Sequence, residues 1–285
     1  MDLKLVTTNR TFPEHGFWDF KGKVDYVDGW FLMKSPVPLL FLSISYLLFV
    51  LKLGPKVMKL REPFKLRSTI ILYNLFQVAY SCFLLFKGSR LIIPNGLLGS
   101  SCLMDEEDFR WRVSTGIYYY FFAKVTELMD TIFFVLRKNF RQVTFLHVYH
   151  HSLMMWSTWI ALKYEPSYNV IFLGTINSSI HIIMYGYYAL SAFPDLNKYL
   201  WWKKYITLMQ ILQFMCIILH AAANYAYSAC PPSYTLLASI LLNALLFVYL
   251  FAEFYVNSYV NKNKINTRSK SINSLANGSV NEKSN

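Results

Sequence analysis

Apolar runs of about 20 residues recur along this chain, and they restrict its fold more than any other feature. In an α-helix such a run crosses the hydrocarbon core of a bilayer, because each residue advances the helix by about 1.5 Å and the core is about 30 Å thick. Of the 285 residues, 55% are hydrophobic and 15% are charged, whereas soluble domains carry about 25% charged residues. The sequence therefore predicts an all-α integral membrane protein.

Seven transmembrane helices are expected, in one domain that covers residues 35–256. Their ranges are 35–53, 69–86, 113–136, 144–163, 168–190, 205–226 and 234–256. Residues 1–34 are polar and lack the apolar core of a cleavable signal peptide, so we expect the first span to act as the insertion signal. Residues 257–285 are rich in Asn, Ser and Lys and predict a disordered tail.

The loops between these helices alternate in charge. One set carries 15 basic and two acidic residues, and it comprises 54–68, 137–142, 191–204 and 257–270. The other set, which includes residues 1–34, carries 10 basic and 10 acidic residues. Lys and Arg accumulate on the cytoplasmic side of a membrane, so we predict a lumenal N-terminus and a cytosolic tail. The net charge of +12 then reflects topology and does not indicate nucleic-acid binding.

Two covalent features are predicted on the lumenal side. Asn9 lies in an NRT sequon and is a candidate for glycosylation. Cys102 and Cys230 lie in two lumenal loops, where disulfides persist, and they are candidates for a bridge.

Polar side chains form one stripe on each of four consecutive spans. The stripes are Lys124, Glu127, Asp130 and Thr131; His147, His150 and His151; Asn177, His181, Tyr185 and Tyr188; and Thr207, Gln210 and Gln213. An ionisable group at the bilayer centre costs about 2.5–3.5 kcal/mol, so the charged stripes must face the bundle interior. For Gln210 or Tyr188 alone, packing between helices is an equally good explanation.

The depth of the stripes predicts where they meet. Counting inward at about 1.5 Å per residue puts the three-histidine stripe roughly 8–14 Å from the cytosolic surface, and His181 roughly 15 Å from it. These positions predict a polar chamber open to the cytosol, with an apolar region beyond it towards the lumen.

The HxxHH stripe is also a plausible half of a metal site. Membrane di-iron oxygenases and desaturases use histidine boxes of this form, but they need more histidines, spread over several boxes. This chain has six histidines, and only four fall in the predicted chamber. A single zinc ion needs three or four ligands, so the count does not exclude it. We expect no bound metal and keep a metal-dependent oxygenase or desaturase as an alternative.

Four motifs occur in order along the chain. They are KVTELMDT (124–131), HVYHH (147–151), NSSIHIIMYGYY (177–188) and TLMQILQ (207–213). In order and spacing the chain resembles the ELO family of fatty acid elongases from about residue 20 to about residue 260. The segments ELMDT and QVTFLHV resemble the members that act on saturated and monounsaturated chains. A seven-span receptor is the non-enzymatic alternative, and a transporter would show internal repeats that are not seen here.

The resemblance implies a multi-pass protein of the endoplasmic reticulum membrane. Its seven helices would form a barrel around the polar chamber and an apolar acyl tunnel. It would condense a long-chain acyl-CoA with malonyl-CoA to give a 3-oxoacyl-CoA, CoA and CO₂, with no bound cofactor. Expected partners are membrane lipid and the reductase and dehydratase of the elongation cycle, and the oligomeric state stays open. The family's lysine-based retrieval signal is missing, because the tail ends in NEKSN.

Cys82 and Cys216 lie outside the four motifs, so an imidazole has to be considered as the nucleophile. The resemblance supports an acyl-imidazole on the histidine box, and we expect it on His150. His147 and His151 would orient that ring or move protons, while His181 and Asn177 would polarise carbonyl groups. The other residues of the first, third and fourth stripes would order the chamber or position the substrates.

Basic residues at the predicted cytosolic mouth are candidates for binding the phosphates of CoA. They are Arg137, Lys138 and Lys204. The cytoplasmic excess of basic residues explains their presence equally well.

Overall fold

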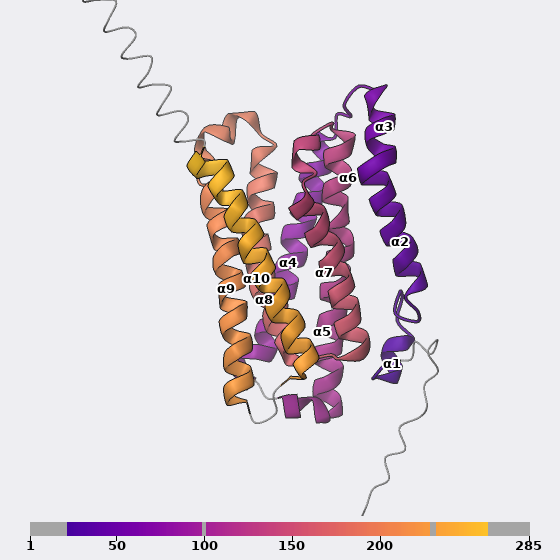
Figure 1. Ribbon diagram of the computed structural model, residues 1–285, viewed down its shortest axis with the longest axis vertical. Coiled ribbons are helices and arrows are strands. Elements are labelled where there is room, and N and C mark those ends of the chain that lie inside the picture. Colours follow the sequence, from indigo (N-terminus) through magenta and orange to yellow (C-terminus); the bar gives the residue numbers. More distant parts are fainter. Residues whose placement is uncertain (1–21, 99–100, 229–231, 262–285) are drawn as a thin grey trace, which may run out of the picture.

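The computed structural model describes residues 22–98, 101–228 and 232–261 (Figure 1), and those residues form helices and loops without any strand. The elements are α1 (Asp25–Asp28), α2 (Val37–Leu48), η1 (Phe49–Leu53), α3 (Gly54–Lys59), α4 (Arg67–Asn95), η2 (Ser101–Asp105), α5 (Glu107–Thr126), α6 (Leu128–Leu136), η3 (Phe140–Gln142), α7 (Phe145–Tyr164), α8 (Tyr168–Ser191), η4 (Pro194–Tyr199), α9 (Lys203–Tyr227), α10 (Tyr234–Tyr255) and η5 (Val256–Val260). The predicted all-α fold is confirmed.

Five helices are long and apolar enough to cross a membrane. They are Val37–Lys59, Arg67–Asn95, Tyr168–Ser191, Lys203–Tyr227 and Tyr234–Val260. Large apolar side chains on their outer faces, such as Phe41 and Leu219, are 73% and 66% exposed, which suits contact with lipid. The protein is therefore a multi-pass membrane protein. The other two predicted spans, formed by α5 with α6 and by α7, contain the ionisable stripes and do not meet the same criterion, so seven crossings stay a prediction.

Two predicted helix ends were wrong. The first span continues past residue 53 to Lys59, because Pro55 stands in the first turn of α3, where its missing N–H leaves no hydrogen bond unmade. The second span continues past residue 86 to Asn95 and includes Lys87 and Arg90. Their charge predicted a loop, but long basic side chains reach outward from a helix and do not end it.

The third predicted span begins earlier than expected, at Glu107, and is interrupted at Glu127, between α5 and α6. Side chains of α4 support the break. Tyr73 donates to the backbone carbonyl of Thr126 at 3.3 Å, and Gln77 donates to the Thr126 hydroxyl at 3.0 Å. That hydroxyl in turn donates to the carbonyl of Ala123 at 2.8 Å. The polar groups around the break are therefore satisfied by hydrogen bonds to a neighbouring helix.

The long helices lie side by side in the bundle (Figure 1). The α4 helix packs along α8, α5 packs along α7, and α9 packs along α10. The α4–α8 contact is close because Gly88 of α4 faces Thr175 of α8, whose side chain leaves no room for a Cβ atom. We call the end of the bundle that carries loops 54–68, 137–142 and 191–204 the basic end. In Figure 1 it is at the top.

Several predictions fall outside the described residues. Asn9, Cys230 and the tail beyond residue 261 are not described, and neither is the side chain of Cys102. Glycosylation, the Cys102–Cys230 bridge and the disordered tail therefore stay predictions. Cys82 and Cys216 are free and lie on exposed surface.

Candidate active site

The centre of the predicted site is a buried group of three side chains from α5, the break after it and α8. The Lys124 ammonium group donates to both carboxylate oxygens of Glu127, at 2.8 and 3.0 Å, and to Oδ1 of Asn177 at 2.7 Å. These residues are only 1%, 2% and 5% exposed. A buried charge needs a partner and satisfied hydrogen bonds, and this arrangement provides both.

Two histidines from different helices face the same carboxylate. His181 of α8 places Nδ1 3.1 Å from Oε1 of Glu127, and His151 of α7 places Nδ1 3.9 Å from Oε2. The first distance is that of a hydrogen bond, while the second is too long for one. The buried Nδ1 of His151 has no hydrogen-bond partner among the described residues. Glu127 therefore joins the KVTELMDT motif to both histidine motifs.

His147 is held at the start of α7. Its backbone N–H donates to the side chain of Thr144, the N-cap of the helix, at 3.2 Å. Its Nε2 lies 3.0 Å from the Thr131 hydroxyl, which lies 2.7 Å from the hydroxyl of Tyr46 on α2. Thr131 has one hydroxyl proton to donate, so a consistent assignment has Tyr46 donating to Thr131 and Thr131 donating to His147.

Asp130 is bonded separately from Glu127. Tyr185 of α8 donates to its Oδ2 at 2.7 Å, and both residues are buried. The two acids of the motif thus have different partners. Glu127 contacts cationic and imidazole groups, while Asp130 accepts from a phenol.

His150 differs from the other three histidines of the site. Its ring nitrogens make no hydrogen bond within the described part of the chain, and its ring packs against Phe247 of α10 with centroids 4.9 Å apart. The His151 ring is 5.4 Å away, centroid to centroid. His150 is also only partly buried, whereas His151 and His181 are buried. Of the four rings, His150 is therefore the one left available for a substrate.

Some predicted residues do not join this group. Tyr188 is 36% exposed, and the only side-chain contact recorded for Gln210 in the described residues is a weak one to the Met184 sulfur at 3.7 Å. Gln213 is buried, and its Oε1 has no partner among the described residues. Hydrogen bonds thus link the stripes of α5–α6, α7 and α8, and the α9 stripe stays apart from them.

The three candidate phosphate-binding residues lie at the basic end. Arg137 and Lys204 are exposed and Lys138 is partly exposed. Lys138 adopts a positive φ of 58° as the chain leaves α6. Their placement agrees with either explanation given for them, and their role stays a prediction.

Four residues of the site were missed from the sequence. They are Tyr46, Tyr73, Gln77 and Tyr120. Tyr120 donates to Asn177 Oδ1 at 2.9 Å and holds its ring 4.7 Å below the Lys124 ammonium group. It stands one helical turn before Lys124, which is a usable signal. Gln77 belongs to a buried stripe with Asn74 and Ser81, at helical spacing.

Metal binding was weighed for the histidine box. Within residues 22–98, 101–228 and 232–261, no group of three or more His, Cys, Asp or Glu side chains is arranged to hold a metal ion. The absence of a metal and of any other bound cofactor stays a prediction.

The helical bundle and the buried histidine–carboxylate–lysine group define a multi-pass membrane protein with an internal polar site. The profile of the GNS1/SUR4 (ELO) family matches residues 31–267, and the chain belongs to this family. The resemblance seen in the four motifs is therefore confirmed.

Relatives of the chain are named as very long chain fatty acid elongases. Human elongase 4 is 44% identical over 214 residues, which are 72% of this chain and 66% of that protein. Elongase 7 of Drosophila melanogaster is 40% identical over 205 residues, 70% of this chain and 61% of that protein. Rat elongase 7 is 36% identical over 242 residues, 83% of this chain and 85% of that protein. The chain thus spans less than two thirds of the first two proteins and most of the third.

Proposed function

We propose that the protein is the condensing enzyme of fatty acid elongation. It joins a long-chain acyl-CoA to malonyl-CoA and forms a 3-oxoacyl-CoA, CoA and CO₂. The observation that carries the proposal is the state of the four histidines: three of them face Glu127 or Thr131, and His150 alone is unpaired among the described residues. The family and the names of the relatives support the same reaction.

In the first step, an unprotonated ring nitrogen of His150 attacks the thioester carbonyl of the acyl-CoA. A C–N bond forms and the C–S bond breaks, and the second ring nitrogen gives up its proton to the departing CoA thiolate. The products are an acyl-imidazole and CoA. His151 and His147 lie on the same helix, with the nearer ring centroid 5.4 Å away, and can pass that proton on.

In the second step, malonyl-CoA loses CO₂ and leaves an enolate at its C2 carbon. The C2 carbon attacks the acyl carbonyl, the C–C bond forms, and the C–N bond to His150 breaks. The leaving imidazole recovers a proton from solvent. Since decarboxylation supplies the carbanion, the chamber needs no strong base.

The contacts of Asn177 and His181 suggest different roles for the two residues. Oδ1 of Asn177 already accepts from Tyr120 and Lys124, so its NH₂ group is free to donate to an oxyanion. With its Nδ1 proton on Glu127, a neutral His181 has a lone pair at Nε2. Asn177 thus suits carbonyl polarisation, and His181 suits proton acceptance.

The remaining predictions complete the proposal. The seven-helix barrel encloses a chamber open at the basic end, which faces the cytosol, and an acyl tunnel runs towards the lumenal end. Arg137, Lys138 and Lys204 meet the phosphates of CoA. The protein resides in the endoplasmic reticulum membrane, works with the reductase and dehydratase of the cycle, and needs no bound metal or cofactor.

Product formation tests the proposal. Purified protein in nanodiscs receives labelled malonyl-CoA and a saturated long-chain acyl-CoA, and the 3-oxoacyl-CoA and CO₂ are quantified. We expect wild type to release both in equal amounts and His150→Ala to release neither. His220→Ala is the matched control, because His220 stacks on Phe172 and bonds to the carbonyl of Leu97, apart from the cluster.

Two outcomes would reject the proposal. One is a wild-type protein that binds acyl-CoA but forms no product. The other is a His150→Ala variant that turns over like the His220→Ala control.

A further inference from the structure

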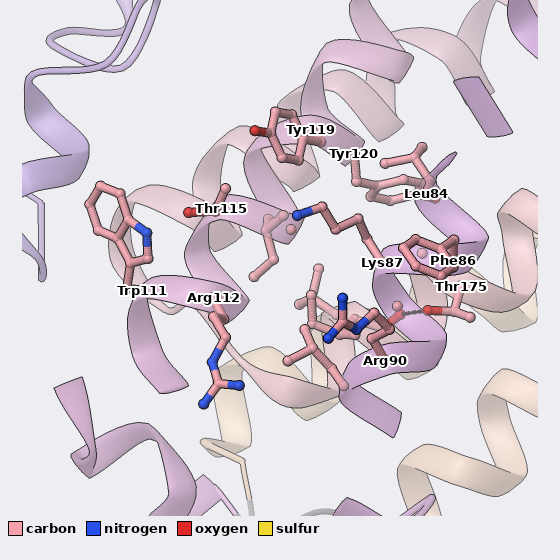
Figure 2. Close-up of a pocket in the computed structure, with 17 residues that line it drawn as sticks. Leu84, Phe86, Lys87, Arg90, Trp111, Arg112, Thr115, Tyr119, Tyr120 and Thr175 are labelled. Carbon is pink, nitrogen blue, oxygen red and sulfur yellow. Dashed lines mark hydrogen bonds between the residues drawn. The ribbon is translucent and has the colours of Figure 1, made fainter. Parts of the chain in front are cut away.

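A cavity of about 320 Å³ opens between α4 and α5 at the end of the bundle opposite to the basic end (Figure 2). The floor of the cavity is formed by α8. Its walls include the apolar side chains of Leu84, Leu91 and Ile117. The four histidines of the candidate active site do not line it, so it is a separate feature of the molecule.

Two cations at the edge of this cavity have no acidic partner among the described residues. They are Lys87 and Arg90, both on α4 and both exposed. Their recorded contacts are with aromatic rings: Lys87 Nζ lies 5.8 Å from the centroid of Phe83, and Arg90 Cζ lies 5.8 Å from that of Phe86. Figure 2 shows the Lys87 amine directed from α4 towards Thr115 of α5.

A third cation, Arg112, also lines the cavity but is already paired. Its Nη2 lies 2.6 Å from Oδ2 of Asp108, and both side chains are more than half exposed. The cavity mouth therefore keeps a net positive charge from Lys87 and Arg90 after the local acid is counted.

The place of these two cations argues for a ligand. Lys87 and Arg90 lie on the last turns of α4, within about 12 Å of its end at Asn95. Basic residues accumulate at the cytoplasmic ends of spans, so topology does not explain a basic pair at the opposite end. Lipid headgroups are the anions at that depth, and basic pockets between membrane helices bind them.

We propose that the cavity binds one anionic glycerophospholipid. Its phosphate is held by Lys87 and Arg90, and one acyl chain lies along Leu84, Leu91 and Ile117. Arginine and lysine both form charge-assisted hydrogen bonds with phosphate. The cavity is open at its mouth, so the rest of the lipid stays in the bilayer.

The position of Tyr120 connects this site to the candidate active site. Its side chain lines the inner wall of the cavity, and its hydroxyl donates to Asn177 at 2.9 Å. A bound acyl chain would therefore pack on a residue that supports Asn177 and Lys124. The lipid site itself does not rest on the proposed reaction.

Lipid retention tests the inference. Full-length protein is equilibrated with equimolar phosphatidylserine and phosphatidylcholine, purified in mild detergent, and analysed by native mass spectrometry. We expect one phosphatidylserine per chain to be retained. Lys87→Gln with Arg90→Gln should weaken retention by about 30-fold, since each cation contributes about tenfold or less near a membrane surface.

Two further variants serve as controls. Lys56→Gln with Lys59→Gln removes the same charge from exposed residues of α3, at the basic end, and should retain phosphatidylserine like wild type. Lys87→Arg with Arg90→Lys keeps both charges and should do the same. The inference is overturned if the Lys87 and Arg90 variant retains as much phosphatidylserine as the α3 variant. It is also overturned if phosphatidylcholine is retained equally, or if inorganic phosphate displaces the lipid completely.

Discussion

Two buried lysines in this protein have similar surroundings and different consequences. Lys124 is 1% exposed and Lys163 is 0% exposed, and each donates to a carboxylate. The partner of Lys124 is Glu127, three residues away, whose oxygens also face His181 and His151. The partner of Lys163 is Asp28, 135 residues away.

The contacts around Lys163 are all with the segment that precedes the first span. Its ammonium group donates to Asp28 at 2.6 Å and to the backbone carbonyl of Met33 at 2.7 Å. Asp28 itself accepts from the backbone N–H of Gly22 at 3.0 Å. This pair fastens residues 22–34 to the end of α7, and no imidazole takes part in it. Burial and pairing alone therefore do not mark a reactive site; what matters is which groups share the carboxylate.

The largest expected effects come from removing either lysine. Lys124→Met and Lys163→Met should each destabilise the fold by about 3–5 kcal/mol, because a buried carboxylate loses its partner. Thermal unfolding in detergent measures this loss. Condensation per folded molecule should disappear for Lys124→Met and stay near wild type for Lys163→Met.

Double variants sharpen the same contrast. Lys163→Met with Asp28→Leu should regain stability and keep activity, since an apolar pair can replace a buried ion pair. Lys124→Met with Glu127→Leu should regain stability and stay inactive. If the second double variant were active, Lys124 and Glu127 would be no more than structural.

The next effect concerns the break at Glu127. Gln77→Ala removes the amide that donates to Thr126, at a cost of about 1–3 kcal/mol. We expect kcat to fall while KM changes little, because Glu127 would no longer be held between Lys124 and His181. Tyr80→Phe is the matched control, since it removes one hydrogen bond between α4 and α5, to the carbonyl of Tyr119. Equal losses of kcat in both variants would show that the break has no special role.

A smaller effect is expected from Tyr46→Phe. The Thr131 hydroxyl would lose its contact with Tyr46 and keep the one to His147. The cost is about 0.5–1.5 kcal/mol, typical of one hydrogen bond, and kcat should fall by about threefold to tenfold. Steady-state kinetics measure it, and Thr131→Val, which removes both contacts, should fall further. A Tyr46→Phe variant as impaired as Thr131→Val would contradict the assigned chain of donors.

The smallest effect is expected at the end opposite to the cluster. Glu165 accepts from the hydroxyl and the backbone N–H of Ser233, at 2.7 and 3.2 Å, and so joins α7 to the start of α10. Because this contact is exposed, Glu165→Gln should cost less than about 1 kcal/mol. We expect unchanged kcat and a small drop in the unfolding midpoint. A loss of activity would mean that this end also controls the reaction.

Much of the fold could be predicted because hydrophobic run length measures the bilayer directly. The ends of α7, α8 and α9 lie within two residues of the predicted ranges. The errors fall where charge and helix coincide, at Lys87 and Arg90, because a charged residue ends an apolar run without ending the helix.

The site divides in the same way. Residues repeated at helical spacing, such as His147 and His151, could be placed on one face from the sequence. The contacts of Tyr46 and Lys163 could not, because their partners lie 85 and 135 residues away and no spacing encodes such pairs. The break at Glu127 has no Pro or Gly to signal it, since its support comes from side chains of α4.

The most direct test of the account is where the acyl group resides between the two steps. Wild-type protein is mixed with a long-chain acyl-CoA in the absence of malonyl-CoA, quenched, digested and mapped by mass spectrometry. We predict that one CoA is released per chain and that the acyl mass is on the peptide carrying His150, with none in His150→Ala. An acyl group on Cys82 or Cys216, or no acylated peptide in a preparation that condenses normally, would contradict the account.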